Sequence, residues 1–207
     1  MASCSHLYVE EALVIRVAAT CEGISPYLMN PATDELLDQL RGRVPKIKNK
    51  DRPVEDEAAD KLCTGPDGRI GISAVNLLSC MIIAGRKVKN GKSQISTAST
   101  TTLTGLLSIE QYFLAFNGDP EWAVDKRRGV NPRGGEMVCL IRPRFDEWSF
   151  DVSFLVDEAE INPTVVREVL RVAGKFVGLG DFRPAKRGPF GRFRVVNWEE
   201  LGGVTDD

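Results

Sequence analysis

The sequence has a single histidine, His6, near the N-terminus of its 207 residues. A Ser-His-Asp triad, a Cys-His pair, a histidine general base or a histidine-rich metal site would each have to be built on that residue. The scarcity of histidine argues against most familiar hydrolytic chemistry. We therefore expect no catalytic residue, no metal site and no cofactor.

Long apolar runs are also missing. The longest candidate, Ala74–Gly85, is interrupted by Asn76 and Ser79 and is shorter than the roughly 18 residues that a membrane span needs. The first residues, MASCSHLYVEE, have neither the charged n-region nor the apolar h-region of a secretory signal. We therefore expect a cytoplasmic protein that does not associate with membranes.

The five cysteines form no CxxC pair and follow no regular spacing. An odd number without such a pattern argues against a disulfide framework and against a zinc site built from cysteine pairs. We expect buried, reduced thiols, which is the usual state of cysteine in the cytoplasm.

Length and composition indicate a folded protein. Hydrophobic residues make up 43% of the chain and charged residues 27%, close to the average of soluble globular proteins and unlike disordered, collagen or coiled-coil chains. No linker and no internal repeat divides the sequence. We therefore expect a single domain over residues 1–207.

The formal net charge of −2 hides an uneven distribution of cations. Four segments hold 21 of the 27 basic residues and two of the 29 acidic ones: Arg41–Pro53, Arg86–Lys92, Lys126–Arg144 and Arg183–Arg194. Solvated loops carry such charges too, but segments so poor in acid predict a face that attracts a polyanion, if folding brings them together. A two-faced charge distribution also suits head-to-tail self-association.

Hydrophobic periodicity predicts an α+β core. In chain order, we expect a strand at Leu7–Ala19, a helix at Ala74–Lys87 with Ser73 as its N-cap, strands at Met137–Arg142 and Trp148–Val156, a helix that Asn162 caps and Pro163 opens, and a strand at Arg192–Trp198. This is the βαββαβ order of a ferredoxin-like domain.

The core leaves a long insertion, at about residues 88–135, between the first helix and the second core strand. Within it we expect a strand at Leu106–Phe116, a loop or edge strand in the hydroxyl-rich run Ser93–Thr104, and a polar connection from Asn117 to Gly135. The second helix has an apolar stripe from Val165 to Val177 that includes Phe176, and Gly178 ends that helix.

The most specific motif is the segment Gly178–Phe193, GLGDFRPAKRGPFGRF, here called the glycine-rich loop. Its glycines permit positive φ and close approach to a ligand, and exposed backbone N–H groups could cradle phosphate oxygens. The segment lacks the last glycine of the dinucleotide-binding fingerprint and the GK[ST] of a P-loop. The alternative is a helix C-cap followed by a basic turn with structural glycines.

This segment resembles the glycine-rich loop of the RAMP superfamily, in which a GxG is followed by basic residues and by a second pair of glycines before the last strand. These are ferredoxin-like, RNA-binding proteins of CRISPR systems. The segment Gly71–Leu78 also resembles the strand-to-helix transition of their backbone subunits. The resemblance implies nucleic-acid binding at Gly178, Gly180, Gly188 and Gly191, as in a CRISPR effector subunit or in a phage or mobile-element relative.

The resemblance does not extend to cleavage. The processing nucleases of the superfamily commonly use a histidine near the first helix as a general base, whereas His6 precedes the first predicted strand. We therefore expect a non-catalytic protein that binds single-stranded nucleic acid, with RNA as the preferred ligand.

The candidate contacts are cations that would hold phosphates and aromatic rings that would stack on bases. They are Lys46, Lys48, Lys50, Arg127, Arg128, Arg183, Lys186, Arg187, Phe190, Arg192 and Arg194. Arg192 and Arg194 alternate with Phe193 and Val195 and would therefore project away from the core. Phe182 is a second stacking candidate, and either Phe182 or Phe190 could fill the core instead.

Two other functions stay open. A metal-independent endoribonuclease would have to take its acid and base from lysines, Tyr8 or Tyr27. An interaction protein would mimic or antagonise a CRISPR effector subunit, or form a filament. The expected partners are single-stranded RNA or DNA, further copies of the chain and CRISPR-type proteins, because composition does not distinguish RNA from DNA.

Overall fold

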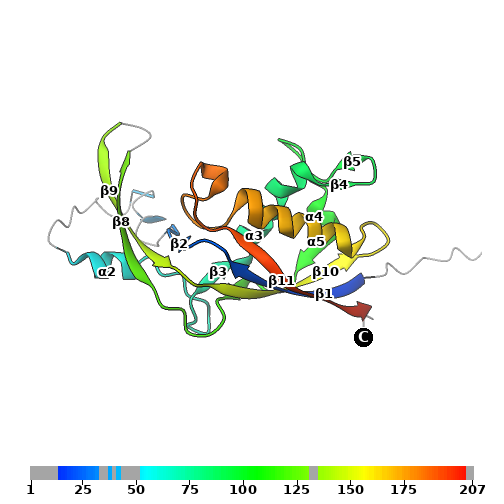
Figure 1. Cartoon of the computed structure of the whole chain (residues 1–207), viewed down its shortest axis with the longest axis horizontal. Coiled ribbons are helices and arrows are strands. Elements are labelled where there is room, and N and C mark those ends of the chain that lie inside the picture. The colour runs from blue at the N-terminus through cyan, green and yellow to red at the C-terminus, as the bar shows by residue number, and fades with distance from the viewer. Residues whose placement is uncertain (1–13, 33–36, 39–40, 43–51, 131–134, 204–207) are drawn as a thin grey trace, which may run out of the picture.

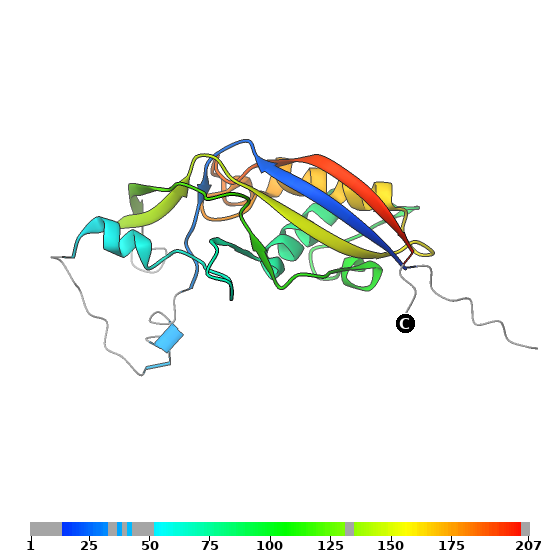
Figure 2. The ribbon, with the colours of Figure 1, turned by 90° about the horizontal axis from the view of Figure 1, so that it is seen from below.

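The computed structural model describes residues 14–32, 37–38, 41–42, 52–130 and 135–203. Its centre is a four-stranded antiparallel sheet in the order β11–β1–β10–β6. The strands are β1 (Val14–Gly23), β6 (Leu107–Ile109), β10 (Ser149–Asp157) and β11 (Phe193–Gly203). Helices α3 (Ala74–Ala84) and α5 (Pro163–Val172) cover one face of the sheet (Figures 1 and 2). The predicted ferredoxin-like α+β fold is confirmed.

Alternating burial holds the sheet against the helices. Val17 and Cys21 of β1, and Phe150 and Phe154 of β10, are fully buried, while their neighbours on the other face are not. This is the period of two that a strand with one solvated face requires. At one end of the sheet, the rings of Phe150 and Phe193 meet edge to face with centroids 5.9 Å apart, a geometry that stabilises a core beyond its buried area.

Local signals fix the ends of the second helix. Asn162 is the N-cap of α5, and its Oδ1 accepts a hydrogen bond from the backbone N–H of Thr164 at 2.9 Å. The helix continues into a π-helical turn, η2 (Ala173–Val177), and ends at Gly178, which has a φ of 74°. These predictions are confirmed. Ser73 occupies the N-cap position of α3, but its side chain makes no capping hydrogen bond.

Replacing Asn162 with alanine should lower the free energy of unfolding by about 1 kcal/mol, and by no more than about 2 kcal/mol, because the N–H of Thr164 loses its acceptor. Urea denaturation of the intact chain measures the difference. The exposed Arg167 on the same helix provides the control, since Arg167→Ala should stay within about 0.5 kcal/mol. Equal stability of the two variants would contradict the capping role.

One core strand was assigned wrongly from the sequence. The second core strand is β6, whereas the segment predicted for that place, Met137–Arg142, belongs to β9 (Met137–Phe145). Strand β9 pairs with β8 (Ala123–Val130) and with β2 (Tyr27–Leu28) in a separate sheet. A strand of three residues such as β6 is too short for periodicity to reveal. Strand β8 also replaces the middle of the expected polar connection.

The other elements are short. They are α2 (Val54–Ala59), β3 (Gly71–Ser73), η1 (Gly85–Lys87), β4 (Lys89–Asn90), β5 (Ser93–Gln94), α4 (Leu103–Leu106), β7 (Phe113–Ala115) and η3 (Pro184–Lys186). The strand expected at Leu106–Phe116 is therefore split into β6 and β7. The expectation of a single domain with an insertion at about residues 88–135 stays a prediction.

Four cysteines fall in the described ranges, and all four are free thiols. Cys21 and Cys80 are buried and Cys63 is half-buried, but Cys139 is exposed, which contradicts the expectation for that residue. It lies on β9 opposite Arg128 of β8, near the end of the β8–β9 hairpin. None of the helices described is both long and apolar enough to cross a membrane.

Candidate nucleic-acid interface

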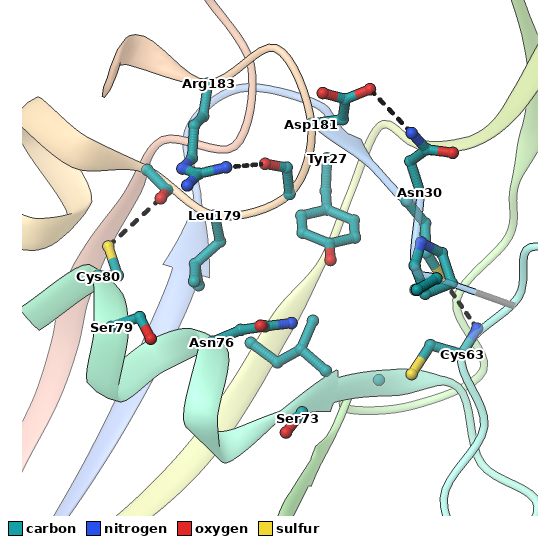
Figure 3. A pocket seen from close by; sticks show the side chains of 17 residues that line it. Tyr27, Asn30, Cys63, Ser73, Asn76, Ser79, Cys80, Leu179, Asp181 and Arg183 are labelled. Carbon is teal, nitrogen blue, oxygen red and sulfur yellow. Dashed lines mark hydrogen bonds between the residues drawn. The ribbon is translucent and has the colours of Figure 1, made fainter. Parts of the chain in front are cut away.

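A pocket of about 410 Å³ opens between the glycine-rich loop and the first turns of α3 (Figure 3). Ser73, Asn76 and Ser79 line it on the helix side, and Gly180 and Arg183 line it on the loop side. The chain that follows β2, at residues 29–32, closes a third side. Hydroxyl, amide and guanidinium groups therefore face a space of the size that small ligands occupy.

Arg183 is the cation of this pocket. Its Nη1 donates to the backbone oxygen of Gly180 at 2.9 Å, which holds the side chain against its own loop. No described acidic side chain forms an ion pair with it. The remaining guanidinium N–H groups are therefore available to an anion.

Two groups of the pocket with acid-base chemistry are held in their protonated form. Burial raises the pKa of the Cys80 thiol to about 12, and its Sγ lies 3.3 Å from the backbone oxygen of Gly178. Burial also raises the pKa of Tyr27, whose ring packs on Phe116 with centroids 5.5 Å apart. Neither group is prepared to act as a nucleophile or a base at neutral pH. Tyr8 lies outside the described residues.

The glycines of the loop are required by contacts within the protein. Gly178, Gly180 and Gly191 have φ values of 74°, 76° and 68°, a region that side-chain-bearing residues rarely adopt. A Cβ at Gly180 would lie 2.6 Å from the backbone oxygen of Leu28, and one at Gly188 or Gly191 would overlap loop backbone. These contacts favour structural glycines over glycines that make room for a ligand.

The expected cradle of backbone N–H groups is largely absent. Within the loop, the N–H groups of Leu179, Asp181 and Gly191 donate to backbone oxygens at 2.8 Å, and those of six further residues are also used: Phe182, Lys186, Arg187, Gly188, Phe190 and Arg192. Buried backbone donors are satisfied first by the protein itself. An anion at this loop would therefore be bound by side chains.

The loop meets the β8–β9 hairpin through an aromatic contact. The guanidinium of Arg127 lies over the ring of Phe190, 4.4 Å from its centroid, and Phe190 itself is only 8% exposed. Phe182 packs against Phe190 at 6.1 Å between centroids but is 40% exposed and has a φ of 47°. Of the two phenylalanines, Phe190 fills the junction and Phe182 presents its ring to solvent.

A buried ionic network joins the same two elements. Arg142 of β9 donates to Asp125 of β8 at 2.9 Å and to Asp181 of the loop at 2.6 Å. Asp125 also accepts from Arg127 at 2.6 Å, and Asp181 accepts from Asn30 at 3.3 Å. Buried charges require such pairing. The sequence placed Arg142 among the cations of a basic face, whereas its side chain is buried and neutralised.

The structure gathers only part of the predicted face. Five of the predicted cations lie at the loop or its junction with the hairpin: Arg127, Arg183, Lys186, Arg187 and Arg192. Arg128 lies on β8 with its side chain on the face opposite to that of Arg127. Arg194 pairs with Glu22 at 2.8 Å on the open face of the sheet.

The other predicted cations lie elsewhere. Lys46, Lys48 and Lys50 are outside the described residues. The segment Arg86–Lys92 forms η1 and the β4–β5 hairpin, which Figure 1 places away from the β8–β9 hairpin, beyond α5. In the described ranges, no three His, Cys, Asp or Glu side chains are arranged to hold a metal ion.

Comparison with known proteins supports the fold. No family model and no curated protein matches the chain. A cryo-EM structure of the Type III-B Cmr-beta bound to cognate target RNA matches 93% of this chain at 12% identity with a TM-score of 0.51. This chain spans 62% of that matched chain. Cmr6 from Pyrococcus furiosus matches 88% of this chain and 98% of its own at 10% identity, with a TM-score of 0.40. The match to the Cmr-beta structure supports the ferredoxin-like fold that the sheet topology shows.

Proposed function

We propose that the protein binds single-stranded RNA without cleaving it, at the junction of the glycine-rich loop and the β8–β9 hairpin. The observation that carries this proposal is a set of cations in the glycine-rich loop that have no ion-pair partner among the described residues: Arg183, Lys186, Arg187 and Arg192. Such cations contact phosphates and give affinity without sequence preference. The shared fold with a Cmr-beta that was solved with its target RNA adds support.

The exposed ring of Phe182 supplies the second part of the proposed site. Among the described residues, Phe182 and Arg187 are the only non-glycine residues with positive φ, and both lie in this loop. Backbone strain of this kind is held in place by the surrounding structure and is concentrated at functional sites. In our proposal, Phe182 stacks on a base while the neighbouring cations hold the backbone of the strand.

The proposal includes a guide-RNA or effector-subunit-like role, with CRISPR-type proteins or further copies of the chain as additional partners. A phage or mobile-element protein that mimics such a subunit would use the same site. Single-stranded DNA is the competing ligand. Parallel titrations with RNA and DNA of one sequence separate the two, because only RNA offers a 2′-OH.

The affinity for single-stranded RNA should fall steeply as the salt concentration rises, and it should depend on the loop arginines that have no ion-pair partner in the described structure. Replacing Arg183 and Arg187 together with glutamine should weaken single-stranded RNA binding about tenfold or more. The slope of log affinity against log salt should fall by about one for each phosphate that the variant no longer neutralises. Fluorescence anisotropy with a labelled homopolymeric RNA at several salt concentrations measures both quantities.

The matched control for this titration is Arg194→Gln. It removes an arginine of the same segment whose charge Glu22 already neutralises on the open sheet face, so the salt slope should not change. A flat salt response of the unmodified chain would contradict phosphate-dominated binding. Discrete products from structured RNA incubated with a chelator would contradict the absence of cleavage and would favour the endoribonuclease.

A further inference from the structure

Outside the proposed site, one aromatic ring lies close to two lysine side chains, at the C-terminal end of the second core helix. The ammonium groups of Lys87 and Lys175 lie 5.5 Å and 5.2 Å from the centroid of the Phe176 ring. Phe176 is 47% exposed, although its place in the apolar stripe of the second helix predicted that it would be buried. Core packing does not explain why this ring is exposed or why two lysine ammonium groups lie close to it.

The π-helical turn accounts for the position of this ring. Residues Ala173–Val177 leave the α-helical period, which changes the direction in which the last side chains of the helix point. Ala173 and Val177 are buried, whereas Lys175 and Phe176 are exposed. The widened turn thus presents a lysine and a phenylalanine together to solvent, and such turns are frequent at functional sites.

The surroundings of Phe176 connect two basic segments. Phe176 lies two residues before Gly178, where the glycine-rich loop begins, and Lys87 ends η1, directly before the β4–β5 hairpin. That hairpin carries the exposed Lys89 and Lys92. The ring of Phe176 therefore lies between the start of the glycine-rich loop and the basic segment Arg86–Lys92, and a strand bound at the loop could pass over this ring to reach that segment.

We propose that Phe176, Lys87 and Lys175 form a second contact site for single-stranded nucleic acid. A base stacks on Phe176 and the two lysines hold the flanking phosphates. An aromatic platform with adjacent cations is the usual means of binding a strand without reading its sequence. This inference rests on the proposed function, because it extends the path of the same strand from the loop toward the β4–β5 hairpin.

The test compares Phe176→Ala with the unmodified chain on RNA oligonucleotides of roughly 4 and roughly 16 nucleotides, the range of lengths that one compact binding domain covers. A second contact acts only on a strand long enough to reach it. The variant should therefore bind the long RNA at least about fivefold more weakly, as expected for the loss of one stacked base, and should bind the short RNA as before. Lys87→Gln with Lys175→Gln should give the same pattern and lower the salt slope.

The matched control is Tyr112→Ala, which removes an aromatic ring that is 95% exposed and contacts no lysine in the described structure. It should leave both affinities unchanged. If Phe176→Ala behaves like Tyr112→Ala, or weakens both RNAs equally, the second site is wrong while the proposed function stands. If the unmodified chain binds neither RNA, the proposed function fails and the second site with it. Binding of DNA with no RNA binding would contradict RNA as the ligand, and the same comparison of variants on short and long DNA would then test the second site.

Discussion

Replacing Arg142 with alanine is expected to destabilise the protein by about 3–5 kcal/mol, the cost of breaking a buried ion pair by removing one partner. The side chains of Arg142 and Asp125 are each only 3% exposed. Without the arginine, the Asp125 carboxylate stays buried with Arg127 as its remaining ion-pair partner, and Asp181 is no longer tied to β9 through its ion pair. Urea denaturation gives the change in stability.

The paired double variant separates charge from packing. Arg142→Met combined with Asp125→Leu removes both charges and keeps apolar volume, so it should be less destabilising than Arg142→Ala alone. The control is Arg144→Ala, a half-buried arginine of the same strand that is 33% exposed and whose partner Asp146 is 59% exposed; the loss of this less buried pair should cost no more than about 1 kcal/mol. A loss for Arg142→Ala no larger than for Arg144→Ala would contradict the role of the network.

Gly191→Ala should also cause a large loss, of about 2–5 kcal/mol. Gly191 has a φ of 68°, which a non-glycine residue adopts at a cost, and its added Cβ would overlap the backbone oxygen of Leu179, which forces the backbone to move. The N–H of Leu179 donates to the Gly191 oxygen at 2.8 Å, so the two sides of the loop base cannot separate without breaking that bond.

Gly68→Ala is the matched control for this substitution. Gly68 has a similar φ of 77°, but a Cβ there would meet no atom within 4 Å. The loss of stability of Gly68→Ala therefore measures the cost of a positive φ alone. The additional loss in Gly191→Ala measures the cost of the overlap between the new Cβ and the oxygen of Leu179. Thermal unfolding of both variants gives the comparison. Equal losses would mean that the loop base opens freely to accommodate the new methyl group.

Local chemistry predicted the parts of the fold that depend on neighbouring residues. Asn162, Pro163 and Gly178 marked the ends of a helix, and the alternation after Trp148 identified β10. The βαββαβ order of the core was predicted, but one of its strands was assigned to the wrong segment. Strand β6 was missed as a core strand because its three residues are ordered by pairing with β10, which is a contact between distant parts of the chain.

The candidate site was predicted less completely, for a reason that particular residues show. Asp125 directly precedes the basic segment Lys126–Arg144, and Asp181 lies two residues before the segment Arg183–Arg194. The two carboxylates that neutralise Arg142 therefore lie outside the segments whose charges predicted the basic face. The binding role of the loop glycines stays a prediction. The tight contacts that require Gly180 and Gly191 involve Leu28 and Leu179 and cannot be read from spacing.

The position of Asp181 has a consequence for how ligands act on the molecule. Its carboxylate belongs to the ionic network of Arg142, and the residue also lines the pocket beside α3. A ligand that displaced this carboxylate would break the ion pair that ties the loop to β9. The same side chain therefore serves both the wall of the pocket and the ion pair between the loop and the β8–β9 hairpin.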